Sequence, residues 1–187
     1  MGNLQDSNKR YIIIYGQPSA GKTRFFYQLL SNNEESELKL LTTFGVNYGE
    51  IKLDKIVLAL FDINGYITNY NVCNMLCKSV LISGIIFIIN MQEINKIDQT
   101  KDTLELILGN NYLPPNQILY IIYNKPSEVK EDDHSWIDEE LLENKLELKK
   151  LKEKYKIKAY FTQILDVSSI RSDLLPKGLY ELESLLL

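Results

Sequence analysis

The chain has only two cysteines and no long apolar run. Cys73 and Cys77 lie four residues apart, a spacing that fits neither a redox pair nor half of a metal site, so we expect two reduced, apolar side chains. The longest apolar stretches, at 85–89 and 118–123, are of strand length. A membrane-spanning helix needs about 20 apolar residues. We therefore expect no segment that spans a bilayer.

A net positive charge is also lacking. The 187 residues carry a formal charge of −4 at pH 7, and the isoelectric point is near 5.2. Because no positive field gathers nucleic acid, DNA and RNA are not expected partners, and any bound phosphate must be held locally. The N-terminus has no cleavable apolar stretch, which predicts an intracellular, cytoplasmic protein. The single histidine, His134, has no cysteine near it and is not expected to be a ligand or a base.

What is present indicates an α/β fold. The length predicts an N-terminal arm at 1–9 and a single domain at 10–187. Hydrophobic periodicity predicts strands at 11–15, 45–53, 55–62, 83–89, 117–123 and 157–164, and helices at 23–30, 67–78, 96–108, 137–155 and 178–187. Alternating strands and helices with uniformly apolar strands favour a six-stranded, mostly parallel sheet with one antiparallel edge strand and helices on both faces.

The clearest functional signal is a glycine-rich loop between the first strand and the first helix. It fits the pattern G-x-x-x-x-G-K-[ST] and consists of Gly16, Gln17, Pro18, Ser19, Ala20, Gly21, Lys22 and Thr23. Its glycines let successive backbone N–H groups converge on an anion at a helix N-terminus. We expect Lys22 to reach the β- and γ-phosphates of a nucleotide and the Thr23 hydroxyl to bind Mg²⁺. This loop predicts a purine nucleotide and Mg²⁺ as cofactors.

Further candidate residues lie in loops that follow other strands. Asp62 is expected to hold Mg²⁺, and the Gly65 N–H is expected to contact the γ-phosphate. Thr43, in a polar loop, is a candidate metal ligand that is released when the γ-phosphate leaves. Ligands of open α/β sheets bind at the carboxyl ends of the strands. The same edge is therefore expected to present Asn124, Lys125, Ser168 and Ser169.

These motifs resemble those of the small GTPases, specifically the ADP-ribosylation factor (Arf) and Arf-like branch. The segment 42–47 is similar to the first switch motif of that family, with Thr43 at the metal-binding threonine. A separation of 19 residues between Thr43 and Asp62 fits the interswitch of the family. The segment 178–181, Gly-Leu-Tyr-Glu, resembles the start of its last helix.

The resemblance implies a P-loop small GTPase fold and a molecular switch that binds GTP or GDP with Mg²⁺. It implies a guanine nucleotide as ligand, with effectors and exchange or activating factors that contact the switch and interswitch surfaces. A role in vesicular or intracellular trafficking and a monomeric state are implied in the same way.

The chain departs from the family at the residue that orients the attacking water. The family has D-x-G-G-Q, whereas here Asn64 and Tyr66 flank Gly65. A phenol cannot both donate to and accept from water as a carboxamide does there. Intrinsic hydrolysis in Ras is already only about 10⁻⁴ s⁻¹, so we expect very slow or absent GTP hydrolysis and assign no catalytic residue.

A second departure concerns recognition of the base. The family motif N-K-x-D appears as Asn124, Lys125, Pro126 and Ser127. The family aspartate accepts two hydrogen bonds from guanine, each worth about 1.5–3 kcal/mol, and Ser127 replaces at most one. We expect weaker guanine selection. By resemblance, Asn124 braces the phosphate loop, the stem of Lys125 covers one face of the base, and Ser168 and Ser169 occupy the third base-contacting loop.

Membrane attachment is expected to be weak. Gly2 is available for acylation, but Asp6 stands where the acylation pattern has a hydroxyl, and Leu4 is the only large apolar residue before Tyr11. One acyl chain without an apolar helix gives only marginal binding. We therefore expect a cytoplasmic protein with at most peripheral contact with intracellular membranes through Gly2.

Two alternatives to a switch stay open at this point. Tyr66 and Ser127 are also compatible with a pseudo-GTPase that binds nucleotide weakly or with relaxed specificity and serves as an interaction scaffold. A small-molecule kinase needs arginines to neutralise the transferred phosphoryl group. The sequence offers only Arg10, Arg24 and Arg171, which disfavours the kinase.

Overall fold

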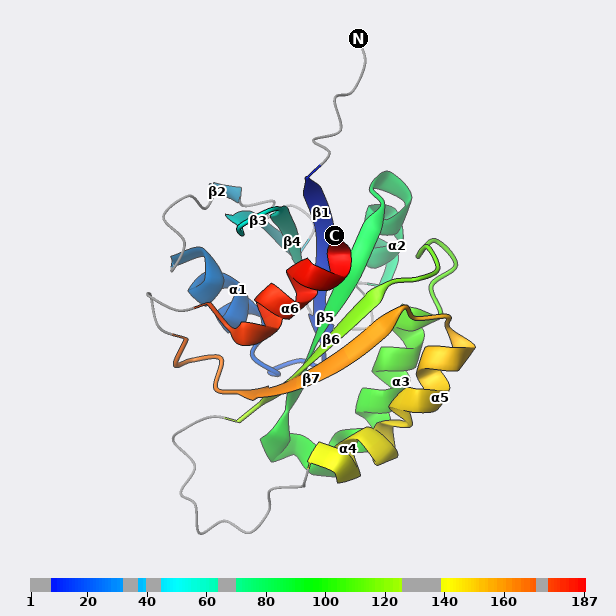
Figure 1. Cartoon of the computed structure of the whole chain (residues 1–187). Helices are drawn as coiled ribbons and strands as arrows, with labels where there is room; N and C mark the ends of the chain where they lie inside the picture. Colours follow the sequence, from blue (N-terminus) through cyan, green and yellow to red (C-terminus); the bar gives the residue numbers. More distant parts are fainter. Residues whose placement is uncertain (1–7, 32–36, 40–44, 64–69, 126–138, 171–174) are drawn as a thin grey trace.

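The computed structural model describes residues 8–31, 37–39, 45–63, 70–125, 139–170 and 175–187 (Figure 1). The strands are β1 (Lys9–Gly16), β2 (Glu37–Lys39), β3 (Val46–Lys52), β4 (Val57–Ile63), β5 (Ile82–Asn90), β6 (Ile118–Asn124) and β7 (Ala159–Leu165). The helices are α1 (Lys22–Ser31), α2 (Tyr70–Ser79), the 3₁₀ segment η3 (Met91–Lys96), α3 (Ile97–Leu108), α4 (Glu139–Leu146), α5 (Leu148–Lys154) and α6 (Lys177–Leu186).

The strands form one sheet in the order β2-β3-β4-β1-β5-β6-β7. Strands β4, β1, β5, β6 and β7 are mutually parallel, and β3 is antiparallel to β4. The predicted α/β class and its six-stranded, mostly parallel sheet are confirmed. A short strand, β2, lies beyond β3 and was not predicted. Three residues are too few to show the alternation that identifies a strand.

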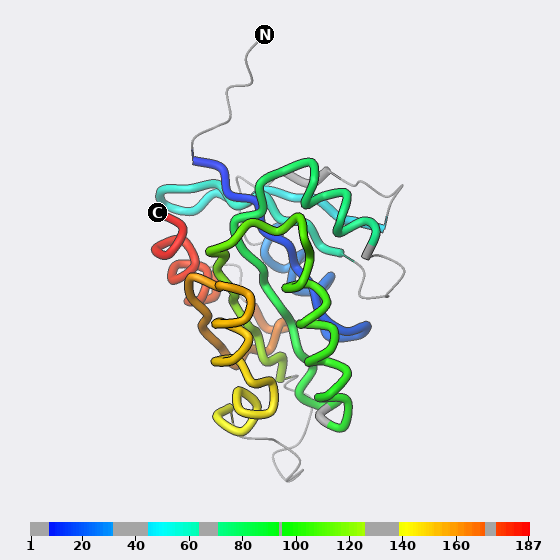
Figure 2. The backbone as a smooth tube through the Cα atoms, turned by 90° about the vertical axis from the view of Figure 1, so that its right-hand side faces the viewer, coloured from blue at the N-terminus to red at the C-terminus, as the bar shows by residue number. Residues whose placement is uncertain are grey.

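Helices cover both faces of the sheet, as predicted (Figures 1 and 2). On the face shown in Figure 2, α2, α3, α4 and α5 contribute apolar side chains to a core that includes Ile13, Ile85 and Ile121. On the other face, α1 and α6 pack over Ile12 and Ile86. Because successive side chains of a strand point to opposite faces, strands covered on both faces must be apolar throughout. This explains the uninterrupted apolar runs of β1, β5 and β6.

The helix predicted at 137–155 is instead two helices, which is a correction to the sequence prediction. Glu147 adopts a left-handed conformation with φ of 53°, and it separates α4 from α5. Its carboxylate pairs with Lys101 of α3 and with Lys150, and these bonds lower the pKa of Glu147 to about 2. A periodicity search cannot detect this break, because Leu148 and Leu151 continue a helical apolar pattern after it.

The last helix docks where a glycine leaves room. A Cβ on Gly178 would lie 2.3 Å from the ring of Tyr120, so α6 can approach β6 only with glycine there. Farther along α6, Glu183 is buried and accepts hydrogen bonds from the N–H groups of Lys55 and Ile56. These contacts fix α6 between the β3–β4 hairpin and β6.

Cys73 and Cys77 of α2 are buried free thiols, as their spacing predicted. Within the described ranges, no helix combines the length and hydropathy needed to cross a membrane.

Candidate nucleotide-binding site

The predicted phosphate loop connects the end of β1 to the start of α1. Two of its backbone positions require glycine. Gly16 has a φ of 144°, and a Cβ there would lie 2.2 Å from the carbonyl oxygen of Ile88. Gly21 has a φ of 99°, and a Cβ there would lie 2.7 Å from Nδ2 of Asn124. Because Ser19 between them also has a positive φ of 61°, the loop curls back on itself before the helix.

Lys22 lies in the first turn of α1 and is buried, with 6% of its surface exposed. Its Nζ donates to the carbonyl oxygen of Gln17 at 2.7 Å, across the opening of the loop. Burial lowers the pKa of Lys22 to about 8, although the negative charge of Asp62 acts in the opposite direction. A buried ammonium beside a glycine-rich loop is a good partner for an anionic ligand, since burial strengthens its interaction with opposite charge.

Asp62 near the end of β4 meets the loop from the neighbouring strand. Its Oδ2 accepts hydrogen bonds from Thr23 Oγ1 at 2.8 Å and from Asn47 Nδ2 at 2.9 Å. Its Oδ1 is buried and has no hydrogen-bond partner among the described residues. A buried carboxylate oxygen without a partner is costly. Carboxylate and hydroxyl oxygens are ligands that Mg²⁺ prefers, so Thr23 and Asp62 fit a magnesium ion.

Asn124 at the end of β6 links the phosphate loop to the loop after β7. Its Nδ2 donates to the carbonyl oxygen of Ala20 at 3.0 Å, and its Oδ1 accepts from the Val167 N–H at 3.2 Å. The side chain is 6% exposed. The contact with Ala20 is the brace that the resemblance implied for Asn124, and the contact with Val167 holds the loop of Ser168 and Ser169 against it.

The loop after β7 is organised by a carboxylate that the sequence analysis did not single out. Asp166 accepts hydrogen bonds from Ser168 N at 2.9 Å, from Ser168 Oγ at 2.6 Å and from Ser169 Oγ at 2.5 Å. An aspartate whose carboxylate accepts from the backbone N–H two residues later forms an Asx turn, which is a common turn in proteins. Lys125 is half-buried, and its N–H donates to Leu165 O at 3.0 Å, which joins both candidate base loops.

Gln17 attaches the phosphate loop to α3. Its Nε2 donates to Gln99 O at 2.8 Å and to Thr103 Oγ1 at 2.6 Å. Neither this contact nor that of Asn47 with Asp62 could be predicted from the sequence, because both join residues from different elements. Pro18 lies in the same loop as Gln17.

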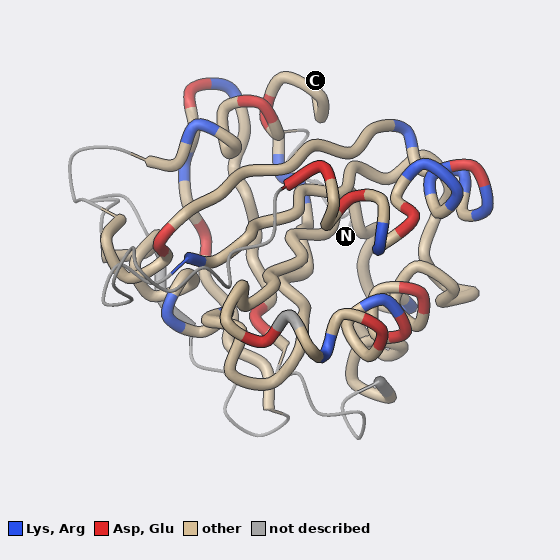
Figure 3. The backbone as a smooth tube through the Cα atoms, turned by 90° about the horizontal axis from the view of Figure 1, so that it is seen from below, with Lys and Arg blue, Asp and Glu red and all other residues tan. Residues whose placement is uncertain are grey.

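Several predicted site residues lie outside the described residues, namely Thr43, Gly65, Tyr66 and Ser127. Gly2 and His134 lie outside them as well. The described candidate residues come together at the carboxyl ends of β1, β4, β6 and β7. Figure 3 shows basic and acidic segments interspersed along the described backbone.

The strand–loop–helix with its buried lysine, and the aspartate that meets it from β4, define a P-loop protein with the small GTPase fold. Residues 1–185 match the sequence model of the ADP-ribosylation factor family, and the chain belongs to that family. Members of the family are nucleotide-dependent switches that bind GTP or GDP with Mg²⁺ and act through effectors and regulators.

Among solved structures, the chain is similar to the Arl6 (BBS3) small GTPase from Trypanosoma brucei, which was solved with the nucleotide analogue GppNp. The two share 16% sequence identity with a TM-score of 0.68, and the match covers 95% of each chain. At this identity the likeness concerns the fold alone. A search of curated proteins found no match.

Proposed function

We propose that this protein is a GTP-binding switch in which the described phosphate-loop residues hold the polyphosphate. The observation that carries the proposal is the meeting of Lys22, Thr23 and Asp62, with one Asp62 oxygen buried and without a partner. Thr23, Thr43 and Asp62 would hold Mg²⁺, which neutralises phosphate charge when bound. Gly16 to Thr23 would surround the phosphates with backbone N–H groups, together with Gly65.

The decisive experiment is direct titration of the purified protein with fluorescent GDP and GTP in the presence of Mg²⁺. We expect saturable, one-to-one binding that Lys22→Ala removes, because Lys22 is the buried cation of the site. Exposed Lys158 offers a matched control, since Lys158→Ala removes the same charge away from the loop. Failure of the parent protein to bind any nucleotide would refute the proposal.

We further propose that hydrolysis is slow or absent. Tyr66 stands where the family has a water-orienting glutamine, and no other residue is assigned to that role. Single-turnover measurements with radiolabelled GTP should give a rate no faster than the intrinsic Ras rate of about 10⁻⁴ s⁻¹. Tyr66→Gln should increase the rate, whereas Tyr66→Phe should leave it unchanged. A rate in the parent protein comparable to that of an activated GTPase would contradict this expectation.

Base recognition is proposed to involve Asn124, Lys125, Ser127, Ser168 and Ser169, with weakened preference for guanine. Asn124 and the loop of Ser168 and Ser169 would form one wall of the base pocket, and the bonds of Val167 to Asn124 and of Ser168 to Asp166 support this. Competition of GDP against ADP measures the preference directly. Equal affinities would mean that the pocket does not select guanine, and identification of the copurifying nucleotide would show which one the protein binds in cells.

The switch is proposed to act in intracellular trafficking as a monomer. Partners would contact the switch segments and the β3–β4 interswitch hairpin, and membrane contact would be weak and would depend on Gly2. Flotation of the acylation-competent full-length protein with lipid vesicles tests the membrane contact. Sedimentation tests the monomeric state.

A pseudo-GTPase scaffold is the second candidate, and one observation favours it. Lys22 Nζ is bonded to Gln17 O within its own loop, so the cation already has an internal partner. A scaffold of this kind would bind a protein partner equally well with GDP, with GTP or with no nucleotide. A partner affinity that differs between the GDP- and GTP-loaded forms would exclude it.

A further inference from the structure

Strand β7 forms the edge of the sheet opposite to β2. Within the described part of the chain, only β6 pairs with it. An edge strand presents a row of N–H and C=O groups that can pair with another extended segment. Charged residues or proline usually protect such edges, but β7 reads Ala-Tyr-Phe-Thr-Gln-Ile-Leu and contains neither.

The register shows which groups of β7 point outward. Asn124 is paired with Leu165, and the Lys125 N–H donates to Leu165 O, so the backbone of Leu165 points toward β6. Residues alternate in this respect along a strand. The N–H and C=O groups of Tyr160, Thr162 and Ile164 therefore point to the free edge. Ile164 is 45% exposed, although it is apolar.

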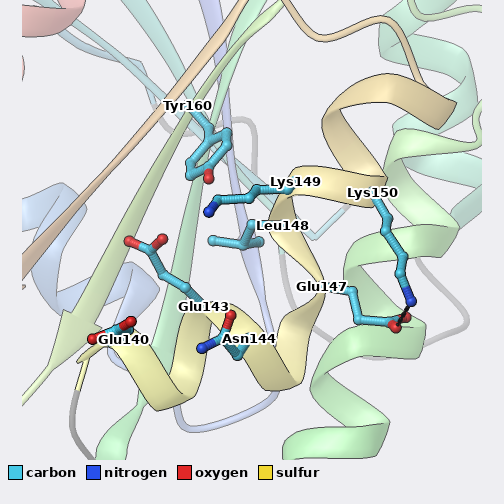
Figure 4. Close-up of a pocket in the computed structure, with 8 residues that line it drawn as sticks. All are labelled: Glu140, Glu143, Asn144, Glu147, Leu148, Lys149, Lys150 and Tyr160. Atoms are coloured by element: carbon cyan, nitrogen blue, oxygen red, sulfur yellow. Dashed lines mark hydrogen bonds and ion pairs between the residues drawn. The ribbon is translucent and has the colours of Figure 1, made fainter.

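Carboxylates line this edge on the side of α4. The Thr162 hydroxyl of β7 donates to Glu139 and lies within hydrogen-bond distance of Glu143 as well. Beside them, a cavity of about 290 Å³ lies between α4, α5 and Tyr160, and Figure 4 shows the side chains around it. Its charged lining residues are Glu140, Glu143, Glu147, Lys149 and Lys150.

The charges of the cavity lining and of Glu139, together called the α4 wall below, do not cancel. Within the described chain, Glu147 pairs with Lys150 and Lys101, whereas Glu139, Glu140 and Glu143 form no ion pair. The excess negative charge affects the buried phenol of Tyr123 beneath the α4 wall. Burial and the charges of Glu143 and Glu139 raise the pKa of Tyr123, and its hydroxyl has no hydrogen-bond partner among the described residues.

On the other face of the sheet, Glu181 of α6 contributes a further carboxylate. Burial raises the pKa of Tyr120 of β6, and the negative charge of Glu181 raises it further. Among the described basic residues near the edge, Lys149 lines the cavity, Lys158 precedes β7 and donates to Leu185 O, and Lys125 follows β6. In the described part of the chain, the side chains of Glu139, Glu140, Glu143 and Glu181 thus place several carboxylates around a strand that has no charge of its own. This arrangement also opposes pairing of β7 with a second copy, because two-fold pairing would bring the α4 carboxylates of both copies together.

We propose that the free edge of β7 binds an extended segment of a partner protein that carries lysine or arginine at alternate positions. The partner backbone would pair with Tyr160, Thr162 and Ile164, and its basic side chains would lie against Glu139, Glu140 and Glu143. This interaction goes beyond the proposed nucleotide function and uses none of the residues assigned to it.

The probe is a short labelled peptide that alternates lysine with valine, titrated against the full-length protein at low and at physiological salt. Ile164→Pro removes an outward N–H without touching the ladder with β6, and Ile164→Val is the matched control that keeps this N–H. We expect Ile164→Pro to weaken peptide binding about tenfold, since it removes one backbone bond and prevents close approach. Ile164→Val should bind as the parent protein does.

Charge recognition is tested with the double variant Glu140→Gln, Glu143→Gln. It should weaken binding several-fold at low salt, with a smaller effect at physiological salt, because exposed charges are screened. A peptide with glutamate in place of lysine should not bind. Equal binding of both peptides, or an unchanged affinity in the double variant, would overturn the proposal.

Backbone pairing has an independent test if Ile164→Pro does not fold, as judged by circular dichroism. A lysine–valine peptide that is N-methylated at alternate residues cannot pair through its backbone, and it should lose binding to the parent protein. Retained binding would exclude strand addition. A concentration-dependent dimer that Ile164→Pro dissociates would show a second copy at this edge and would also overturn the proposal.

Discussion

The phosphate half and the base half of the candidate site are built differently. On the phosphate side, Lys22 and Asp62 are buried; Lys22 donates to Gln17 O of the loop, and Asp62 accepts from Thr23. On the base side, Ser168 is half-buried and Ser169 is exposed, and both are held by Asp166 from their own loop. Asn124 contacts both halves.

The difference shows where this chain can change without losing its fold. The phosphate half is part of the packing between β1, β4 and α1, so substitutions there disturb buried contacts. The base half consists of loops at the edge of the sheet, which tolerate sequence change more easily. In the sequence, the departure at Ser127 lies in the base-recognition motif, whereas the phosphate loop keeps every position of its motif.

The largest effect is expected from Lys22→Ala, which tests the phosphate half alone. Two charge-assisted hydrogen bonds to phosphate are worth about 1.5–3 kcal/mol each, so nucleotide affinity should fall about a thousandfold. Fluorescent nucleotide titration measures it for guanine and adenine nucleotides in parallel. Both should lose affinity equally, and a loss for one base only would show that Lys22 also affects base recognition.

Removal of Mg²⁺ should have the next largest effect. Without the ion, the Asp62 carboxylate faces phosphate oxygens of like charge, so chelation should weaken nucleotide binding about a hundredfold. Asp62→Asn is the matched variant, because it keeps the shape and removes the charge. The nucleotide affinity of Asp62→Asn should fall much less on chelation than that of the parent protein. An equal fall in both proteins would show that Asp62 does not act through the metal.

Ser127→Asp tests the base half. Restoring one carboxylate should add at least one charge-assisted hydrogen bond to guanine and raise the preference for GDP over ADP about tenfold. Ser127→Ala is the control and should leave the preference low. The affinity for ADP should stay nearly constant in both variants. If Ser127→Asp strengthened the binding of ADP as much as that of GDP, residue 127 would not select the base.

The smallest effect is expected from Gln17→Ala, which cuts the tie between the phosphate loop and α3. Two hydrogen bonds of a partly exposed side chain contribute about 1 kcal/mol in all, so affinity should fall about fivefold for either base. Thr103→Val removes only one of the two bonds and should have a smaller effect. A change in base preference in either variant would break the separation of the two halves.

The sequence predicted the order of the elements well where a local pattern existed. The apolar runs of β1, β5 and β6 and the motif of the phosphate loop lie within one continuous segment each. It predicted one helix at 137–155, because Glu147 gives no sign in the sequence that it takes a left-handed conformation. That conformation is maintained by packing and by ion pairs with Lys101 and Lys150. The role of Asp166 also stayed hidden, because an aspartate after a strand is common.

By itself, the sequence determined the class of fold and the loop that marks the protein as a nucleotide binder. Both depend on neighbouring residues, whose types set backbone conformation and apolar periodicity directly. Only the tertiary structure decided that Asp62 would meet Thr23 and that Asn124 would join Ala20 to Val167. It also decided that β7 would be left at an edge framed by carboxylates. These contacts join residues far apart along the chain, and their geometry depends on how the sheet and helices pack.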